Sequence, residues 1–411
     1  MGYIKREFID KILDIAVIQD VIGDFVELKR SGANLKGKSP FVDEKTASFI
    51  VSPVKQIWKD FSSGKGGNVV NFLMQVKHFT YPEAIEYLAQ KYKEPVQYDN
   101  SEQATKKVAE ISKKQEIRPV LEATLIQYQK QFSLLDDDHP AKKEVFTKRE
   151  YSLDDVVEWG IGYAPENFLY DLLKNSGRVT EGLALGLLGN GQNNAYDVYT
   201  NRVVYPIHDK NGLLIGLAGR DISDTKKYSK WINPKVDADN ILYDKSKVWY
   251  GLHKARTEIR KRNEVFIVEG YNDVIAMHKY GCINTIAPCG TAITEQQMNE
   301  LKKLCDKVVF VMDPDNAGKR SVIKYSETFL KLGFRVESIT LDYDPDDFSR
   351  VYKELICLSG GLQEMFNHDI RIDAFKLLME DKLQGSDIDK LKGAEYLSEL
   401  IAQISDNAMI E

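Results

Sequence analysis

The stretch KVVFVMDPDNAGKRS, residues 307–321, indicates the fold class, because an apolar strand leads directly into two aspartates and a helical pattern follows. EVFIVEG at 264–270 repeats this form, with a strand that ends in Glu269. Strands that alternate with helices predict a parallel sheet with helical crossovers, an α/β arrangement. The other members of this alternation are the strands at 283–290 and 334–341 and the helices at 271–281, 294–305 and 316–333.

Acidic residues stand at the carboxyl ends of three of these strands, where a parallel sheet carries its functional groups. They are Glu269, Asp313, Asp315, Asp344 and Asp346. Carboxylates gathered in one cleft repel one another, so the pattern implies bound cations. Oxygen ligands without histidine or cysteine favour Mg²⁺ or Mn²⁺. A helix N-cap explains any single aspartate at such a junction as well, but it does not explain the whole series.

Length and composition exclude several classes of protein. The chain has 411 residues, 43% hydrophobic and 29% charged, which predicts about two or three globular domains. The formal net charge of −6 argues against a general polyanion binder. There are four cysteines, with no CxxC pair, and no apolar run approaches the roughly 20 residues that span a bilayer. We therefore expect a cytoplasmic protein without disulfides and without a membrane segment.

Two segments are basic despite the negative total. Residues 29–67 carry eight Lys and Arg against three Asp and Glu, and residues 220–262 carry twelve against six. The second segment stands just before the acidic sheet, and this combination suits a polyphosphate or nucleic-acid substrate. On charge alone, a solvated face of lysines and arginines is the alternative.

The patterns divide the chain into five parts. Residues 1–94 hold helices, two pairs of short strands and a helical end whose last helix opens at Pro82. Residues 95–118 are charged and poor in large apolar groups, which predicts a linker that is in part helical. Residues 119–262 are helical to about 192, with the loop YAPEN at 163–167 as an interruption, and then strand-rich, with strands at 196–207 and 212–219 and a GxG-like turn that ends at Arg220. Residues 263–347 form the parallel sheet, and residues 348–411 are helical without a strand.

Several motifs, in this order, resemble the Toprim domain that bacterial primases, topoisomerases and some nucleases share. They are FIVEGYNDVIA with the downstream GTAIT, VVFVMDPDNAGKRS, and DPDD. NRVVYPIHDKNG, GLAGRD, KWINP and LYDKSKVWYGLHKA, within 201–255, are most similar to the bacterial and phage replicative primase family of the DnaG type. Asn272 stands where that family usually has Met, and Pro314 where it often has Gly; neither position is a ligand.

The resemblance implies a DNA primase, a DNA-directed RNA polymerase that makes short RNA primers on single-stranded DNA by two-metal nucleotidyl transfer. It implies a multidomain α/β protein, α+β overall, with a ribbon-like first domain, a mixed subdomain, a Rossmann-like Toprim sheet and a helical end. Glu269, Asp313 and Asp315 would be catalytic, with Asp344 and Asp346 as further metal ligands and Asp273 behind them. General-base catalysis and metal ligation explain Glu269 equally well. The positions that line the family's nucleotide and template groove fall on Arg202, Arg220, Lys230, Asn233 and Lys245.

The first domain is similar to the family's zinc ribbon but lacks its metal ligands. Residues 36–42 and 58–67 match the two ligand-bearing elements. Val has no donor atom and Ser is a poor ligand for Zn²⁺, so no tetrahedral site is available and no zinc is expected. The four ligand positions are Ser39, Val42, Asp60 and Ser63. We expect the ribbon to fold without metal, around a core of Phe41, Phe49, Ile57 and Phe61.

This degenerate ribbon is expected to bind the template through Lys55, Trp58 and Lys59, because cations hold phosphate and an aromatic ring stacks on a base. Strand alternation puts Trp58 on the opposite face from the two lysines. A core position for Trp58 is therefore an equal alternative.

The implied partners are single-stranded DNA, ribonucleoside triphosphates, the RNA–DNA product and a replicative helicase. Two rival functions would use the same residues. One is a Toprim-type nuclease, against which the primase-like motifs at 202–255 argue. The other is a non-catalytic primase paralogue that binds single-stranded DNA, against which the intact carboxylates argue.

Overall fold

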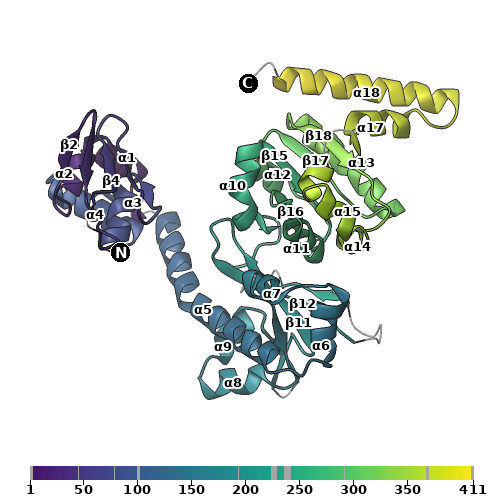
Figure 1. Cartoon of the computed structure of the whole chain (residues 1–411), viewed down its shortest axis with the longest axis horizontal. Coiled ribbons are helices and arrows are strands. Elements are labelled where there is room, and N and C mark those ends of the chain that lie inside the picture. Colours follow the sequence, from purple (N-terminus) through teal and green to yellow (C-terminus); the bar gives the residue numbers. More distant parts are fainter. Residues whose placement is uncertain are drawn as a thin grey trace. The chain divides into compact units, whose positions relative to one another are not determined.

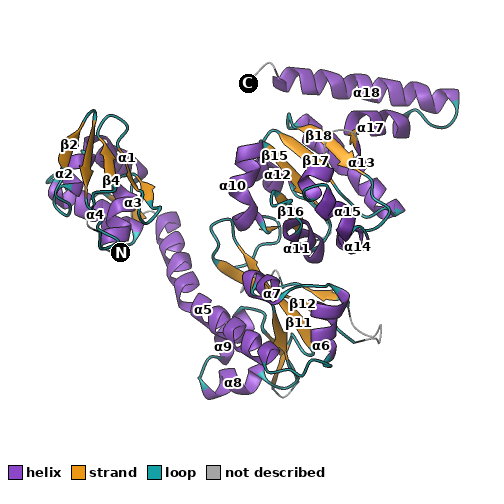
Figure 2. Ribbon diagram, in the orientation of Figure 1, coloured by secondary structure: helices purple, strands orange, loops and turns teal. Residues whose placement is uncertain are grey.

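The computed structural model describes residues 3–44, 46–77, 79–99, 102–192, 194–223, 229–235, 242–290, 292–366 and 370–408. The chain divides into two compact units, residues 1–113 and 114–411 (Figure 1). Helices and sheets occur in both units, which confirms the expected multidomain α/β class (Figure 2). Parts of the basic segment, residues 224–228 and 236–241, and Thr291 of the GTAIT turn lie outside the described residues.

The first unit is an antiparallel sheet with helices packed against it. Its strands pair in the order β2-β3-β4-β5-β6, and a short pair, β1 with β7, joins the two ends of the unit. Both expected strand pairs are confirmed, and Pro82 lies in the first turn of α4 as predicted. The elements are β1 Tyr3–Ile4, α1 Arg6–Ile15, α2 Ile18–Ile22, β2 Lys29–Ser31, β3 Asn34–Gly37, β4 Phe49–Ser52, β5 Ile57–Asp60, β6 Gly66–Gly67, α3 Val69–Val76, α4 Tyr81–Lys91 and β7 Tyr98–Asp99.

A cluster of aromatic rings between the sheet and α3 forms the core of this unit. Trp58 stacks on Phe49 with ring centroids 5.3 Å apart, and its edge meets Phe72 at 5.7 Å. Phe41 completes the cluster, 5.4 Å from Trp58. Trp58 is only 2% exposed, and its indole N–H donates to the Asn68 carbonyl oxygen at 2.9 Å. The structure therefore supports a core position for Trp58 and not a surface position that could stack on a base.

Two of the four expected core residues of the ribbon are exposed instead. Ile57 is 45% and Phe61 66% exposed. Along β5, Trp58 and Asp60 are buried while Ile57 and Lys59 are exposed, because successive side chains of a strand point to opposite faces. Ile57 therefore lies on the outer face of β5 and Phe61 just after the strand, and neither is on the face that packs against the helices.

The second unit begins in helix α5, which runs through the later part of the predicted linker. A four-stranded antiparallel sheet follows, in the order β13-β12-β11-β8. Strand β8 overlaps the predicted loop YAPEN, and β9 corrects the helical prediction around it. Three residues are too few to show a period of two. GLLIGLAG at 212–219, predicted as a strand, is confirmed as β12, whereas the turn expected to end at Arg220 is part of this strand. The elements are α5 Glu102–Ser133, α6 Pro140–Lys142, the π-helix η1 Lys143–Lys148, α7 Leu153–Trp159, β8 Gly162–Ala164, α8 Leu169–Asn175, α9 Val179–Ala184, β9 Leu188–Asn190, β10 Ala195–Asp197, β11 Arg202–His208, β12 Leu214–Asp221 and β13 Trp231–Ile232.

The predicted parallel sheet is confirmed in the same unit, with every expected strand and helix present. Its order is β14-β16-β15-β17-β18-β19, and the four central strands run parallel. The order places β15 and β17 at the centre, beside the point where the connections reverse direction. The elements are β14 Trp249–Tyr250, α10 Leu252–Arg262, β15 Glu264–Ile267, α11 Tyr271–Lys279, β16 Thr285–Pro288, α12 Glu295–Lys302, β17 Lys307–Phe310, α13 Asn316–Lys331 and β18 Arg335–Ile339.

Both faces of this sheet are covered, which explains why its strands read as continuous apolar runs. Val265, Ile267 and Phe310 pack with α10, α12 and α13 in one cluster. Phe266 and Val309 pack with α11 and α14 in another. The two layers of helices fix the strands rigidly, so the residues that follow the strands are held in place by the sheet itself.

The C-terminal part is helical except for one strand. β19 pairs antiparallel with β18, which corrects the prediction of no strand after 348. Its three residues again give no readable period. The elements are α14 Pro345–Val351, α15 Lys353–Leu358, α16 Leu362–Met365, β19 Arg371–Asp373, α17 Ala374–Lys382 and α18 Asp387–Ala408.

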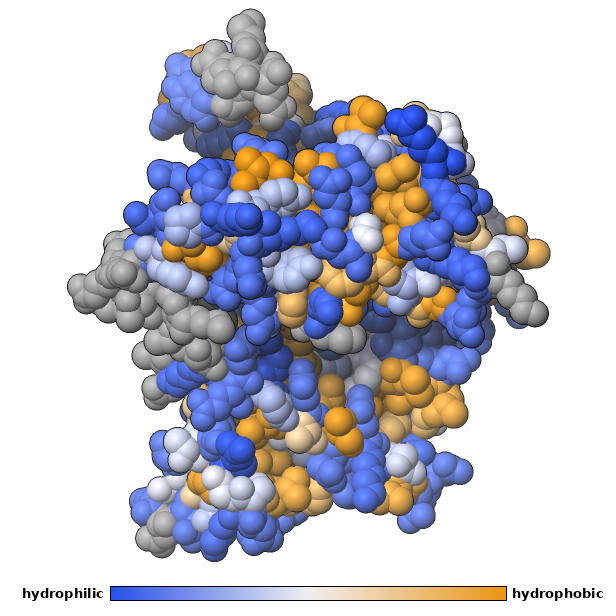
Figure 3. Space-filling view, turned by 90° about the vertical axis from the view of Figure 1, so that its left-hand side faces the viewer, coloured by the Kyte–Doolittle hydropathy of each residue, from blue (hydrophilic) through white to orange (hydrophobic). Residues whose placement is uncertain are grey.

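Within the described residues, none of the helices combines the length and the apolar character that a membrane span requires. The face of the molecule in Figure 3 is largely hydrophilic, with hydrophobic residues interspersed.

Candidate active site

Glu269 and Asp313 meet at the carboxyl ends of two neighbouring strands. β15 and β17 pair in parallel with Ile267 opposite Phe310, so the residues that follow them lie side by side. The Asp313 backbone N–H donates to Glu269 Oε1 at 3.2 Å. Gly318 permits this approach, because a Cβ there would lie 2.2 Å from the Asp313 carbonyl oxygen and 3.0 Å from Glu269 Oε1.

Asp315 and Asp344 lie at the starts of two helices beside this pair. Asp315 Oδ1 caps α13 by accepting from the N–H groups of Ala317 and Gly318, each at 2.8 Å. Asp344 Oδ1 caps α14 by accepting from the Asp347 N–H at 2.7 Å. The N-cap alternative is thus correct for one oxygen of each carboxylate. The second oxygen takes no part in either cap.

The electrostatics of the four acids fit a bound cation. Burial raises the pKa of Asp313 to about 6, helped by the carboxylates of Glu269, Asp344 and Asp315 and opposed by Lys230. Burial and neighbouring acids likewise raise the pKa of Glu269. Asp313 Oδ1 is buried without a hydrogen-bond partner among the described residues. A buried, unpaired carboxylate oxygen among like charges is stabilised by a cation, and the all-oxygen donor set suits Mg²⁺ or Mn²⁺.

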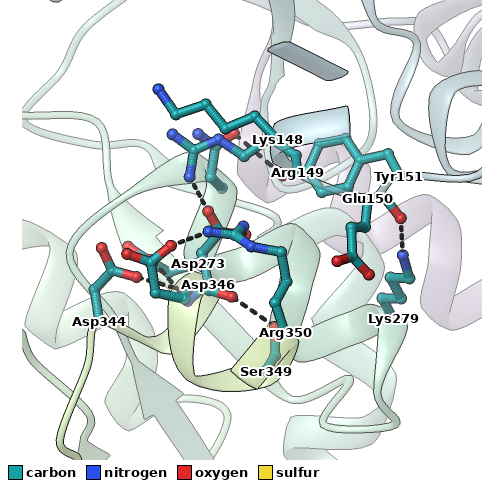
Figure 4. A network of polar contacts seen from close by, with 12 residues as sticks. Lys148, Arg149, Glu150, Tyr151, Asp273, Lys279, Asp344, Asp346, Ser349 and Arg350 are labelled. Atoms are coloured by element: carbon teal, nitrogen blue, oxygen red, sulfur yellow. Dashed lines mark hydrogen bonds and ion pairs between the residues drawn. The ribbon is translucent and has the colours of Figure 1, made fainter. Parts of the chain in front are cut away.

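Asp346 differs from these four acids because arginines hold both of its oxygens. Arg149 Nη1 contacts Oδ2, and Arg350 Nη1 donates to Oδ1 at 2.6 Å (Figure 4). Asp346 is 1% exposed. Its carboxylate lies within 4.8 Å of those of Asp344 and Asp347, so proximity alone would admit it to a metal site. The expected role of Asp346 as a ligand nevertheless conflicts with its two arginine partners.

Asp273 lies behind the acids, as expected. Its Oδ2 accepts from the Gly270 N–H at 2.9 Å, and its Oδ1 accepts from the Asp346 N–H at 3.3 Å. Burial raises its pKa well above the ordinary value, and the carboxylates of Asp344 and Asp313 raise it further. Asp273 therefore ties the start of α11 to the loop that carries Asp344.

A hollow of about 380 Å³ opens beside Glu269. Trp231 and Tyr271 line it and meet edge to face, with centroids 5.1 Å apart. Asn233 also lines it and is fixed by two hydrogen bonds, since its amide donates to the Cys289 carbonyl at 3.1 Å and its Oδ1 accepts from the Tyr271 hydroxyl at 2.7 Å. The hollow thus joins an aromatic wall to the acidic cluster, and its size suits a small ligand.

The four expected cations of the groove fall into two groups. Lys230 and Lys245 are exposed. The positive charge of Lys230 lowers the pKa of Asp313. Lys245 lies at the edge of the hollow, because its Cδ is 3.9 Å from the position that a Cβ of Gly290 would occupy. Arg202 and Arg220 are 3% and 5% exposed. Their burial conflicts with direct contact to a nucleotide or template.

Both buried arginines bind protein groups. Arg202 Nη1 donates to the carbonyl oxygens of Gly219 at 3.1 Å and Ser229 at 3.0 Å, so it holds the start of the segment that carries Lys230. Arg220 Nε contacts Glu144, and its guanidinium lies over the Trp231 ring at 5.5 Å. Both arginines therefore support the site from behind.

Sequence reasoning missed Glu144, Arg149 and Arg350. Arg350 follows Asp346 by four residues in a helical pattern, a spacing that brings side chains together and is a readable signal. Arg149 stands 197 positions from Asp346, and nothing in the local sequence connects them.

The four former ligand positions of the ribbon are joined by hydrogen bonds. Asp60 is fully buried, and the hydroxyl of Ser39 donates to its Oδ2 at 2.7 Å. The Ser63 hydroxyl contacts the same oxygen, and the Val42 N–H donates to Ser39 Oγ at 3.1 Å. Ser62 and Ser48 lie 3.0 Å and 3.1 Å from Asp60 Oδ1. These hydroxyls give the carboxylate a polar environment of the kind that a buried charge requires.

Replacing Asp60 by alanine is expected to destabilise the first unit by roughly 2–4 kcal/mol, because several buried hydroxyls lose a charged acceptor. Burial alone would raise the pKa of Asp60, but the serine hydroxyls lower it to about 2. A carboxylate whose folded pKa is depressed stabilises the fold above its unfolded pKa of about 3.9, and that contribution is lost as the pH falls toward 2. Chemical unfolding of both proteins from pH 7 to 3 measures this, and an unchanged difference over that range would contradict it.

The expected template residues of the ribbon are split between surface and core. Lys55 is exposed in the turn between β4 and β5, and Lys59 is exposed on β5. Trp58 belongs to the aromatic core, so its predicted stacking role is corrected. Phe61, which directly follows β5 and is two residues from Lys59, is an exposed aromatic residue.

Three family models match successive parts of the chain. The CHC2 zinc finger matches residues 4–106, the N-terminal domain of the DNA primase catalytic core matches 128–256, and the Toprim domain matches 263–340. The first match agrees with a ribbon fold although the ligand positions hold other residues.

Curated relatives and solved structures agree with these matches. The DNA primase of Clostridium acetobutylicum is 34% identical over 84% of this chain and 57% of its own length, and that of Mycolicibacterium smegmatis is 30% identical over 95% and 62%. This chain spans less than two thirds of their length. The Aquifex aeolicus primase structure, with zinc-binding and RNA polymerase domains, has a TM-score of 0.60 at 27% identity and covers 98% of this chain and 95% of its own. A DNA primase domain from Pseudomonas aeruginosa has a TM-score of 0.59 at 25% identity, over 71% of this chain and 90% of its own.

The order of the three domain matches is the order in which the sequence motifs occur, and the acids of the parallel sheet lie inside the Toprim match. The chain belongs to the DNA primase family of the DnaG type.

Proposed function

We propose that this chain is a DNA primase, a DNA-directed RNA polymerase that synthesises short RNA primers on single-stranded DNA. The observation that carries the proposal is the Glu269–Asp313 pair, with its buried, unpaired oxygen, at the edge of a hollow with an exposed lysine beside it. Residues 119–262 and 263–347 would act as the two halves of the polymerase core, and residues 1–94 as a template-binding domain.

The residues that would hold divalent cations are Glu269, Asp313, Asp315 and Asp344. Two such ions would supply activation of the attacking 3′-hydroxyl and charge neutralisation of the triphosphate and its leaving group. The Glu269 carboxylate, whose pKa burial raises, would either accept a proton from that hydroxyl or serve as a metal ligand. Asp315 and Asp344 use one oxygen each as a helix cap, so the two helices orient the remaining oxygens toward the cluster.

Lys230 and Lys245 would bind the phosphates of the nucleotide or the template. Replacing either by alanine is expected to weaken apparent nucleotide or DNA affinity with little change in stability, because both side chains are exposed. The loss should shrink as salt rises, since the contacts are with phosphate.

Fluorescence anisotropy of labelled single-stranded DNA and of a nucleotide, at two salt concentrations, measures this loss of affinity. Lys174→Ala, an exposed lysine on α8, is the control, and an unchanged affinity of both site variants at low salt would contradict the assignment.

The ribbon would bind template across the outer face of its sheet. The strand register aligns Lys29, Lys36, Ile50 and Lys59 in one row, and the three lysines are exposed. Phe61 offers an exposed ring next to this row, which suits a stacked base between phosphate contacts. We propose that the ribbon does this without zinc, because Ser39, Val42, Asp60 and Ser63 bond to one another; elemental analysis showing about one zinc per chain would contradict this.

Ribonucleoside triphosphates, the RNA–DNA product and a replicative helicase would be the further partners, in the cytoplasm. A Toprim-type nuclease is the rival function, because the same acids would serve hydrolysis. Parallel reactions separate the two: incorporation of a labelled ribonucleotide on single-stranded DNA, and degradation of the same DNA carrying an end label. Incorporation without degradation supports the primase, and degradation without incorporation would replace it by the nuclease.

A further inference from the structure

The loop that carries Asp344 is pinned at Asp346 by two arginines from different parts of the second unit. Arg350 belongs to α14, the helix that the loop opens, and donates to Asp346 Oδ1 at 2.6 Å. Arg149 comes from the segment just after the π-helix η1 and contacts Asp346 Oδ2. With a side-chain exposure of 2%, Asp346 has both oxygens committed to guanidinium groups.

The Arg149 side chain is itself held in a buried network. Its Nε donates to Glu144 Oε1 at 3.1 Å, and Arg220 of β12 contacts the same carboxylate oxygen. Arg149 and Glu144 have side chains that are 9% exposed. These ion pairs form a chain from Arg220 on β12, through Glu144 on η1 and Arg149, to Asp346. The chain connects the antiparallel sheet with the acidic edge of the parallel sheet.

We infer that Asp346 is a positioning residue that anchors the Asp344 loop to Arg149, and that the cation ligands are confined to Glu269, Asp313, Asp315 and Asp344. This inference rests on the proposed metal-dependent function of the same site. If Asp346 turned to a metal, Arg149 and Arg350 would each lose one of two carboxylate partners and keep only Glu144 and Asp347 respectively, and breaking a buried ion pair is unfavourable.

The backbone around Asp346 points to the same role. Its N–H donates to Asp273 Oδ1 at 3.3 Å, and its carbonyl accepts from the Ser349 hydroxyl at 2.9 Å. The residue is thus fixed through its main chain and its side chain at once. Asp344, two positions earlier, keeps one carboxylate oxygen outside its helix cap. Because Asp346 is held in place, it fixes the orientation of the Asp344 carboxylate, as residues behind metal ligands commonly do.

The test compares Asp346→Asn with Asp344→Asn in the full chain, with the number of bound Mn²⁺ ions measured by electron paramagnetic resonance of free Mn²⁺. Asp346→Asn should bind as many ions as the wild type and lose about 10–100-fold in synthesis rate, the usual effect of a group behind a metal ligand. Asp344→Asn should bind fewer ions. If Asp346→Asn loses an ion as Asp344→Asn does, Asp346 is a ligand and the inference is overturned.

A double-mutant cycle with Arg149→Met asks whether the two residues act as one unit. If Asp346 acts through Arg149, the double variant should lose no more activity than the more severe single variant, whereas independent roles would multiply the losses and overturn the inference. Arg149→Lys keeps the charge without the two-pronged guanidinium and replaces Arg149→Met if that variant does not fold. Arg178→Met, on an exposed arginine, is the control. The Mn²⁺ count tests the role of Asp346 even if the wild type makes no RNA. Failure of the proposed primase function can therefore be distinguished from failure of this inference.

Discussion

Replacing Asp313 by asparagine is expected to abolish primer synthesis and, at the same time, to make the metal-free protein more stable. The carboxylate lies among Glu269, Asp315 and Asp344, and its Oδ1 has no hydrogen-bond partner among the described residues. Loss of a charged metal ligand should reduce synthesis by about 10³-fold or more. Loss of the repelling charge should raise the free energy of unfolding by about 1–2 kcal/mol, less than the full pKa shift implies because the group is partly exposed to solvent.

The sign of this stability effect follows from the pKa of Asp313, which burial and the neighbouring acids raise to about 6. A folded pKa above the unfolded one means that the ionised form destabilises the fold at pH 7, and the penalty fades as the pH falls below about 6. Thermal unfolding in EDTA at pH 7 and pH 5 measures it. The control is Asp306→Asn, an exposed aspartate at the other end of β17. Near-normal synthesis by Asp313→Asn in Mg²⁺ would contradict the assignment.

Replacing Trp58 by alanine is expected to cost the first unit roughly 3–5 kcal/mol, the usual penalty for deleting a buried tryptophan. The ring is 2% exposed, stacks on Phe49 and donates a hydrogen bond to Asn68. A unit of this size has only a few kcal/mol in reserve, so it should be largely unfolded at 37 °C. Circular dichroism melting of the whole chain, followed by limited proteolysis to locate the unfolded unit, measures the effect.

Phe61→Ala is the matched variant of an exposed aromatic residue just after the same strand. Phe61 is 66% exposed, so stability should change by less than about 0.5 kcal/mol. Affinity for single-stranded DNA should fall by about 1–3 kcal/mol if the ring stacks on a base. Equal loss of stability in both variants would contradict the core and surface assignments, and unchanged DNA binding by Phe61→Ala would remove the ring from the template surface.

The sequence was sufficient for the parallel sheet because its strands are buried on both faces and its acids follow them directly. Glu269 and Asp313 could be paired in advance, since the carboxyl ends of adjacent parallel strands share one edge. The short strands β8, β9 and β19 were not predictable, because a three-residue strand shows no period and its existence depends on a partner strand. The same limit applies to Trp58, whose face is set by the helix that packs on it.

Charged residues were harder to place than apolar ones. Arg202, Arg220 and Lys230 look alike in sequence, yet two are buried against protein acceptors and one is exposed. Asp346 looks like its neighbour Asp344, and two arginines distinguish them, Arg350 at a helical spacing and Arg149 from a distant part of the chain. The sign of a side chain's charge can be read from the sequence, whereas the partner that neutralises it is determined by the tertiary structure.

The most direct test is RNA synthesis from the four ribonucleoside triphosphates on single-stranded DNA in Mg²⁺, with no primer supplied. The wild-type chain should make short RNAs that depend on the template, and Asp313→Asn should make none. Absence of RNA from the folded wild-type protein in both Mg²⁺ and Mn²⁺, or equal synthesis by Asp313→Asn, would contradict the claim that the acids of the parallel sheet form a polymerisation centre.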